Sequence, residues 1–426
     1  KLNAGISRLA SRDLADALLS GVMRDIRFKY GKWNRRELFD RNYSETRNPE
    51  IPSAILETMS HQNFTDMRYG QDPNFKFTLA RSIYKTILRY VSDQHGAEFT
   101  VTPLAPDNFY IDFSNKDVAT LHWSEVNDLQ ESTSRPNGYI VYMASGHGGF
   151  DNGTLVHKNN YSVHLEPGVI YNFRVSAINR GGESFPSETL SALFQPNSTK
   201  TILIVNGFHR LSSPAVISND SLQGFDMTKD PGISYGPTAG WYGCQTNFDR
   251  KAIGTSLGEG SSELVGSFVA GNNFDYPREH GEAISHHGKY SFVSCSSQAV
   301  ENKSVNLNKY DMVDLILGLE KDDGHSLVSY KSFSPEMRLR ISEYLHNGGS
   351  LLASGSFIGS AMTSKAEQEF NSKILKITYS ESDSIRQNEI IDGMGTNFDI
   401  YSSLNEEHYA VTSPDILQPI LPAQCA

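Results

Sequence analysis

Two residues with acid/base chemistry flank a short apolar run near the start of the chain. Glu57 ends the run from Pro52 to Leu56, and polar residues follow directly. The run predicts a buried strand, and open α/β sheets place their functional groups at the carboxyl ends of strands. Glu57 is therefore a candidate catalytic acid/base. Arg47, before the run, is a candidate either for holding a substrate carboxylate or for a structural salt bridge, and the sequence leaves both roles open.

This segment resembles the end of the zinc-dependent N-acetylmuramoyl-L-alanine amidases of the amidase_3 type. Arg47, Pro52, Ser53 and Glu57 keep that family's spacing. The resemblance implies that Glu57 is the acid/base of a hydrolase that cleaves the amide between N-acetylmuramic acid and L-alanine in peptidoglycan. In the family two His and one Glu bind the zinc, and they lie before this segment. We therefore expect the zinc of the parent enzyme to have no site in this chain.

The expected absence of zinc has a consequence for activity. Zinc lowers the pKa of its bound water from about 15.7 to about 7, which supplies the nucleophile for amide hydrolysis. A general base on its own contributes roughly 10²–10⁴-fold. We therefore expect this chain alone to be inactive as an amidase, even with Glu57 in place.

A second candidate site lies in the C-terminal half of the chain. Ser356 follows an apolar run, where an amidotransferase-like sheet places its nucleophile, and His209 lies in the loop after another such run. The sequence from Gly355 to Gly359 does not fit the Gly-x-Ser-x-Gly nucleophile elbow. Catalysis by Ser356 therefore competes with the alternative that this sheet serves binding or packing.

Three further histidines are weaker candidates as metal ligands. His61 lies in a polar stretch, and His286 and His287 are adjacent. Adjacent histidine side chains diverge, and a histidine near the end of a helix more often interacts with its last carbonyls.

Composition limits the classes of partner. The 426 residues carry a formal net charge of −11, which argues against nucleic acid because phosphate binding needs a basic surface. No apolar run is long enough to predict a membrane span. Three cysteines are too few for a disulfide scaffold, and a Cys244–Cys295 bridge and two buried thiols are equally open.

Three sequence patterns predict a multidomain protein that combines α/β and all-β units. Residues 1–100 are expected to form the C-terminal half of a zinc-amidase-like α/β domain, with helices on either side of the Glu57 strand. Apolar residues at helical spacing predict these two helices: Leu14, Leu18, Val22 and Ile26, then Phe75, Leu79, Ile83, Ile87 and Val91.

Residues 101–197 change to short alternating strands separated by Gly, Pro and Asn. The segment resembles a fibronectin type III domain through Trp123, Tyr139, the Leu165-x-Pro-Gly-x-x-Tyr corner and the Gly-Gly turn before Ser184. The resemblance implies a β-sandwich with Trp123 in its core. Such modules usually act as spacers. Tyr110 and Phe150 are the candidates for a sugar-stacking surface on this module.

Residues 198–426 alternate apolar strands and helices. The runs from Thr201 to Asn206, Tyr290 to Ser294, Tyr310 to Gly318 and Gly348 to Ser356 predict a parallel sheet, with a helix from Ser334 to Leu345. Their order resembles flavodoxin-like and class I glutamine-amidotransferase-like domains. With the run from Ala270 to Ile284, it also resembles the C-terminal domain of secreted bacterial proteins often labelled xanthan lyases.

Two functions from different classes follow from these resemblances. In the first, the chain is the C-terminal part of a secreted, periplasmic or cell-surface cell-wall hydrolase that acts on peptidoglycan. In the second, it is a glycan-binding or polysaccharide-processing protein that acts through its C-terminal domain. Peptidoglycan or another glycan is the expected partner in both.

Overall fold

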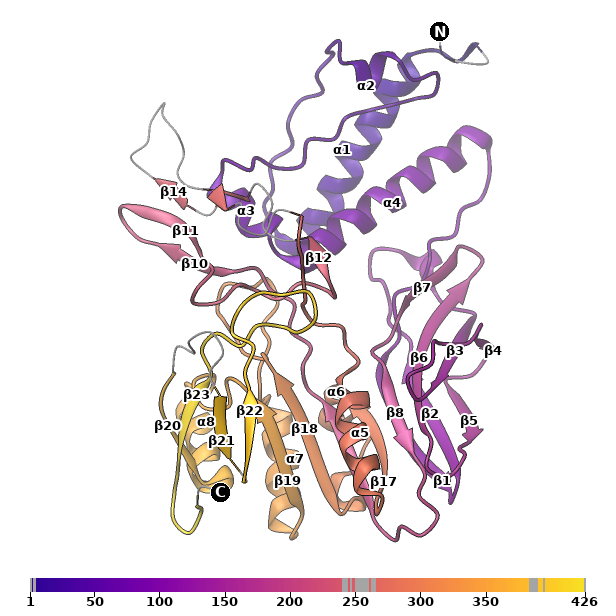
Figure 1. Ribbon diagram of the computed structural model, residues 1–426. Helices are drawn as coiled ribbons and strands as arrows, with labels where there is room; N and C mark the ends of the chain where they lie inside the picture. Colours follow the sequence, from indigo (N-terminus) through magenta and orange to yellow (C-terminus); the bar gives the residue numbers. More distant parts are fainter. Residues whose placement is uncertain are drawn as a thin grey trace.

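The computed structural model describes residues 2, 5–239, 244–245, 247–249, 260–261, 266–382, 390–393 and 395–424. The N-terminal region is helical, a β-sandwich follows, and a mixed helix and sheet region ends the chain (Figure 1). The N-terminal helices are α1 (Leu9–Tyr30), α2 (Ser44–Arg47), α3 (Phe64–Gly70) and α4 (Pro73–His95).

Helices α1 and α4 pack against each other and confirm the two predicted helices. Leu18 and Ile26 of the first stripe are buried. In α4 only the start of the predicted stripe is buried, at Phe75, whereas Ile87 and Val91 are exposed. The reason is that α4 turns a polar face toward α1, where Lys85 forms a 3.0 Å ion pair with Asp25.

The predicted strand from Pro52 to Leu56 is wrong. These residues form an irregular extended segment, and the described residues 5–106 contain no strand with which it could pair. A strand needs a neighbour to satisfy its backbone N–H and C=O groups. The local apolar pattern was therefore insufficient to define a strand.

The sandwich consists of two sheets, as the sequence predicts. One contains β1 (Asp107–Asn115), β2 (Val118–Ser124) and β5 (Asn160–His164). The other contains β3 (Gly138–Ser145), β4 (Thr154–Val156), β6 (Ile170–Asn179), β7 (Gly182–Pro186) and β8 (Leu190–Leu193). Trp123 is buried between them with its ring 5.3 Å from that of Tyr139, and Leu165 belongs to the same core.

The predicted parallel sheet is present in the third region. Its strands are β9 (Thr201–Asn206), β17 (Ser291–Ser296), β18 (Met312–Gly318) and β19 (Ser350–Gly355), in the spatial order β19-β18-β9-β17. All neighbouring pairs in this order are parallel. Helices α5 (Tyr276–His287), α6 (Ser297–Glu301) and α7 (Pro335–His346) connect or cover the strands.

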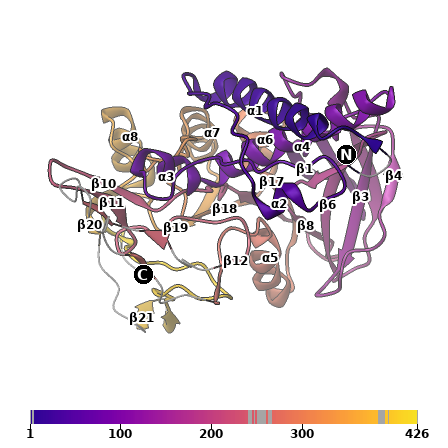
Figure 2. The same ribbon diagram turned by 90° about the horizontal axis from the view of Figure 1, so that it is seen from above.

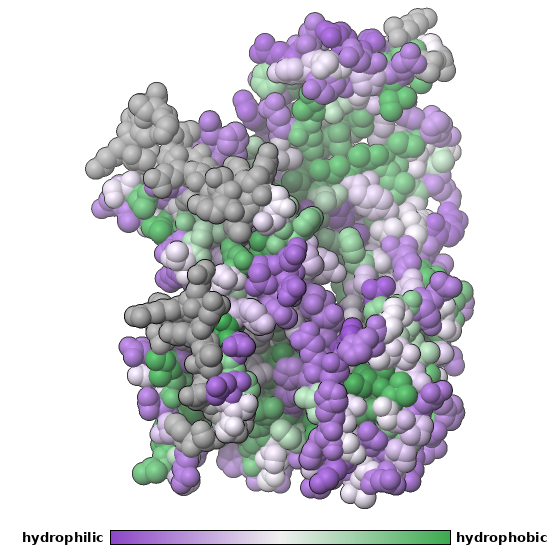
Figure 3. All heavy atoms as spheres, in the orientation of Figure 1, coloured by the Kyte–Doolittle hydropathy of each residue, from purple (hydrophilic) through white to green (hydrophobic). Residues whose placement is uncertain are grey.

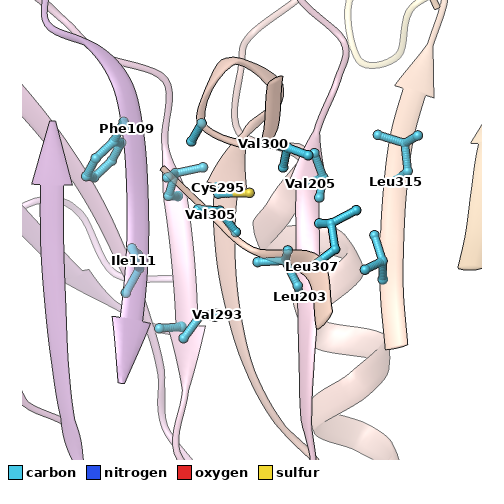
Figure 4. Packing of buried hydrophobic residues seen from close by; sticks show 14 of the residues in the cluster. Phe109, Ile111, Leu203, Val205, Val293, Cys295, Val300, Val305, Leu307 and Leu315 are labelled. Atoms are coloured by element: carbon cyan, nitrogen blue, oxygen red, sulfur yellow. The ribbon is translucent and has the colours of Figure 1, made fainter. Parts of the chain in front are cut away.

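The sandwich and the parallel sheet are joined through β17. One edge of β17 runs parallel to β9, and the other pairs antiparallel with both sandwich sheets, Phe292 with Leu193 and Cys295 with Tyr110. Figure 4 shows Phe109 and Ile111 of β1 beside the β17 side chains. These residues belong to one continuous apolar core with those of β9 and β18. The module is therefore integrated with the next region, which differs from the spacer that the sequence predicts.

Smaller elements extend from the parallel sheet. After β9 come β10 (Ala215–Ser218), β11 (Leu222–Asp226), β12 (Thr238–Ala239), β13 (Cys244–Gln245), β14 (Asn247–Asp249), β15 (Gly260–Ser261) and β16 (Phe268–Val269). After β19 come α8 (Lys365–Phe370), β20 (Ile377–Ser382), β21 (Ile390–Gly393), β22 (Thr396–Asp399) and β23 (Asp415–Pro419). Within the described residues no helix has both the length and the apolar character needed to cross a bilayer.

The N-terminal helices lie above the carboxyl ends of the parallel strands (Figures 1 and 2). Asp72 caps α4 and also accepts a hydrogen bond from the backbone N–H of Leu327, which lies after β18. Asn74 donates to the backbone oxygen of Leu211. Phe64 of α3 packs on Phe225 and Phe248. The carboxyl edge of the sheet is thus enclosed by all three regions.

Candidate functional site

The parallel sheet has a topological switch point between β9 and β18. From β9 the chain passes to β17 on one side, and then crosses to β18 on the other. In sheets of this kind ligands bind outside the carboxyl ends of the two strands where the direction reverses. The loops after Asn206 and after Gly318 therefore mark the place to search for a site.

Glu320, in the loop after β18, connects these two loops. It is 4% exposed, and its Oε2 accepts hydrogen bonds from the backbone N–H groups of His209 (2.9 Å) and Arg210 (2.8 Å). Burial raises the pKa of Glu320 to about 7, although His209 and the two N–H groups oppose that rise. A carboxyl with such a pKa exchanges protons near neutrality, as a general acid or base must.

Glu188 reaches the same place from the sandwich. It lies just before β8 and accepts a hydrogen bond from Nδ2 of Asn206, the last residue of β9. Burial raises the pKa of Glu188, and His209 opposes the rise. The Oδ1 atom of Asn206 is buried and has no hydrogen-bond partner among the described residues. Such an orphaned acceptor is uncommon in a native interior.

His209 lies between these groups. Its Nε2 is 3.0 Å from the carbonyl oxygen of Asn206, and a carbonyl can only accept, so Nε2 carries the proton. The opposite nitrogen, Nδ1, is then the one that can accept a proton. The sequence placed His209 in a ligand-facing loop, and the structure places it at the switch point.

A row of aromatic rings leads to His209. The ring of Phe274 lies 6.3 Å from that of His209 and 5.8 Å from that of Tyr235, which is 58% exposed. Phe274 has φ 60°, a strained conformation for a bulky residue, and Asn272 holds its backbone N–H. We call Glu188, Asn206, His209, Phe274 and Glu320 the junction site.

A network of ion pairs around a buried arginine lies next to the junction site. Arg210 is fully buried and pairs with Asp230 and Asp323. Lys321 adds a 2.9 Å contact to Asp230. Although burial raises the pKa of Asp230, Arg210 and Lys321 outweigh it and bring the pKa to about 2. This network fixes the loops that carry His209 and Glu320.

Ser356 does not pair with His209. It lies just after β19, and β18 separates β19 from β9. Its backbone N–H donates to the carbonyl of Gly318, and no described residue bonds its hydroxyl. A serine nucleophile needs a base within hydrogen-bond reach. The structure therefore shows no hydrogen bond between Ser356 and His209, the two residues of the second candidate site.

Glu57 and Arg47 are both exposed and do not come together. Arg47 ends α2, and its guanidinium donates to the side chain of Asn42 at 2.9 Å. Glu57 lies on the irregular segment. His61 is exposed, while His286 and His287 end α5. Among the described residues no three His, Cys, Asp or Glu are grouped so that they could hold a metal ion.

Each of the two candidate sugar-stacking rings on the sandwich, Tyr110 and Phe150, is half-buried and already contacts a neighbouring side chain. Arg174 lies 4.2 Å from the ring centre of Phe150, and His122 stacks on Tyr110 at 4.6 Å. Cys295 is a buried free thiol whose pKa is raised by burial, whereas the side chain of Cys244 lies outside the described residues.

A shallow hollow of about 270 Å³ lies elsewhere, between α7 and α8. Arg338, Phe370 and Lys373 are among its lining residues, and no residue of the junction site is. No residue that lines this hollow combines a shifted pKa with a neighbouring unpaired polar atom, whereas the junction site has both. The junction site is therefore the better candidate.

Sequence reasoning missed Glu188, Phe274 and Glu320. Glu320 follows a predicted strand, and the rule that pointed to His209 could have found it. Phe274 lies in a run that was recognised without a role. Glu188 carries no such signal, because it belongs to the sandwich segment and follows no strand of the parallel sheet.

The comparisons with known proteins concern the sandwich. The family described as "Fibronectin type III domain" matches residues 104–192. No curated protein matches the chain. Similar solved structures include titin domains, with 27% identity over 21% of this chain and 30% of that one and a TM-score of 0.19. Another, titled "Structure of FN3tt mut", has 24% identity over 22% of this chain and 97% of that one, also with a TM-score of 0.19. At such scores the assignment rests on the family match.

Proposed function

We propose that the chain binds and processes a glycan at the junction site. The observation that carries this proposal is the aromatic row of the exposed Tyr235 and the half-buried Phe274, which leads to polar groups at the switch point. A sugar ring presents an apolar C–H face and a rim of hydroxyls. Binding sites of this kind combine aromatic surface with a few placed polar groups.

The polar groups match the hydroxyl rim. Asn206 offers an unpaired acceptor, and carboxyl groups with raised pKa offer donors when protonated. Glu320, with a pKa of about 7, is a suitable proton donor or acceptor beside His209. The two carboxyls and the imidazole together supply the groups for acid/base cleavage of a glycan.

Turnover of acidic bacterial polysaccharide and of peptidoglycan by the purified chain tests this proposal. We expect release of reducing or unsaturated ends, and we expect Glu320→Gln to reduce it about 10²-fold or more. Glu367→Gln is a matched control, since Glu367 is equally buried but caps α8, away from the site. Release that is unchanged in Glu320→Gln, or absent with every substrate, contradicts the proposal.

A second proposal is that the chain belongs to a secreted zinc amidase that acts on peptidoglycan, with Glu57 as its acid/base. What supports it is a pair of helices with uncovered apolar residues, as helices that flank a further sheet have. Phe28, Ile87 and Val91 are 44–63% exposed, and hydrophobic side chains gather over α1 and α4 in Figure 3.

The described residues do not fit a zinc site around Glu57. The side chain is exposed and no described metal-ligand group surrounds it. We therefore assign no zinc chemistry to these residues. Zinc content per chain, measured after desalting from zinc-containing buffer, tests this point: we expect a value near zero. A value near one that His61→Ala abolishes would contradict it.

A further inference from the structure

We propose that the fibronectin type III module is a working part of the junction site, and that its Glu188 positions Asn206 for a sugar hydroxyl. This inference rests on the proposed glycan-binding function. It adds that the ligand is recognised across the border between two regions of the chain.

The first step is that the module is fixed against the site. Ser191 of β8 donates its backbone N–H to Oγ of Ser294 at 2.7 Å, and the same Oγ donates back to the carbonyl of Ser191 at 2.8 Å. Thr189, next to Glu188, donates its N–H to the carbonyl of Phe274 at 2.9 Å. Glu188 thus directly precedes a segment that is hydrogen-bonded to the site at two residues.

The second step concerns what Glu188 does to Asn206. The carboxylate accepts from Nδ2, which fixes the orientation of the amide. Asn206 is fully buried, and its Oδ1 is left without a described partner. A buried acceptor without a partner is costly to desolvate, so a ligand donor that pairs with it is favoured.

The third step is the charge on Glu188. Burial raises the pKa of Glu188, which favours its neutral form. The other titratable groups that face it are His209 and the thiol of Cys295. When Glu188 is protonated, it and Asn206 present a donor and an acceptor side by side. A hydroxyl, which both donates and accepts, is the group that uses such a pair.

Phe274, whose backbone is strained, also contacts the module. Phe274 connects the module to the aromatic row, because its carbonyl binds Thr189 and its ring lies between those of His209 and Tyr235. A conformation with φ 60° is strained for a bulky residue and persists where the surroundings impose it, commonly at functional sites. The module therefore also sets the aromatic part of the site.

Binding of simple sugars to the full chain tests this inference without requiring turnover. The probes are glucose, mannose, glucuronic acid and N-acetylglucosamine, each as mono- and disaccharide, measured by saturation-transfer NMR. We expect at least one to bind, Glu188→Ala and Asn206→Ala to weaken it tenfold or more, and Glu188→Gln to stay within about threefold. Gln keeps the acceptor for Nδ2 and offers an N–H donor where a protonated Glu188 would offer an O–H.

Glu183→Ala is the matched control, because Glu183 is an exposed acid of the same module that binds the hydroxyl of Tyr142. It should leave sugar binding unchanged. If a sugar binds equally well to the parent chain, Glu188→Ala and Asn206→Ala, this inference fails while the proposed function stands. If no sugar binds, both fail. If Glu188→Ala does not fold, the comparison of Asn206→Ala with Glu188→Gln decides.

Discussion

The middle of the α1–α4 interface buries an ion pair, whereas the interface between the sandwich and the parallel sheet buries apolar side chains. Asp25 and Lys85 are 1% and 2% exposed, and Ser82 completes their hydrogen bonding. Across β17, by contrast, Val293 and Cys295 lie in one core with the sandwich residues (Figure 4).

This difference indicates which parts of the chain unfold together and which part unfolds separately. A buried ion pair pays a desolvation cost that roughly offsets its attraction, so it adds specificity of pairing more than stability. Apolar burial stabilises by about 25 cal/mol per Å² and extends wherever the core is continuous. We therefore expect residues 104–206 to unfold together with β17 and β18, and the helix pair to open separately.

The strongest test of this comparison is Trp123→Ala. Removing a buried Trp costs about 3–5 kcal/mol, and we expect the loss to reach the parallel sheet. Hydrogen exchange should show lower protection of the amides in β9 and β18 as well as in β2. Phe185→Ala is the control, because Phe185 is 66% exposed on the same module and should change stability by about 0.5 kcal/mol or less. Unchanged protection in β9 and β18 would show two independent units.

The next test is Lys85→Met, which leaves the buried carboxylate of Asp25 with only the exposed Arg24 as its cation. We expect a loss of about 3 kcal/mol, confined to amides of α1 and α4. The double variant Asp25→Leu/Lys85→Met should recover most of it. Lys373→Met, in an exposed ion pair with Glu369, should cost no more than about 0.5 kcal/mol. A double variant as unstable as the single one would contradict this account.

Changing the pH should affect the stability of the two regions differently. The pKa of Glu320 is raised to about 7, so its contribution to stability is present below pH 4.5 and is lost as the pH rises through 7. For Asp25, burial is outweighed by Ser82 and Lys85 and the pKa is lowered, so its contribution is lost only below pH 3.8. Between pH 5 and 8 we expect the junction to lose on the order of 2 kcal/mol, while the helix pair is unchanged.

Unfolding by denaturant at several pH values, with hydrogen exchange corrected for intrinsic rates, measures this difference. Glu320→Gln should flatten the dependence of the junction in that range. If the α1–α4 helix pair lost stability over the same pH range as the junction, the two regions would not differ in their pH dependence.

The smallest expected effect is that of Asp72→Ala. Asp72 accepts from the N–H groups of Asn74 (2.8 Å) and Leu327 (3.1 Å), so it both caps α4 and connects it to the loop after β18. We expect a loss of about 1–2 kcal/mol and faster exchange at these two amides. Asp72→Asn keeps an acceptor and should lose less; equal losses would exclude the hydrogen-bonding role.

Local patterns predicted most elements but not how they meet. The Thr201–Asn206 strand and the α7 helix follow from apolar spacing alone, and the structure has them within two residues of the expected ends. The Pro52–Leu56 run has the same local character and forms no strand, because strand formation depends on a neighbour that local sequence does not specify.

Only part of the candidate site could be predicted from the sequence, for a related reason. His209 follows its strand directly, so the switch-point rule locates it. Glu188 lies within a segment that fits a sandwich strand, and nothing near it in sequence indicates that β8 borders β17. The contacts of Glu320 with the loop after β9 join residues about 110 positions apart, and global packing rather than local sequence sets such contacts.

The position of β17 also has a consequence for synthesis of the protein on the ribosome. The sandwich strands end at Leu193, but β17, which covers the edges of β1 and β8, begins only at Ser291. At roughly 5–20 residues per second, those edges remain open for about 5–20 seconds after the sandwich has been made. During that interval a nascent chain presents unpaired strand edges, which invite pairing with other chains. Chaperone binding or rapid elongation during this interval would protect the nascent chain from such pairing.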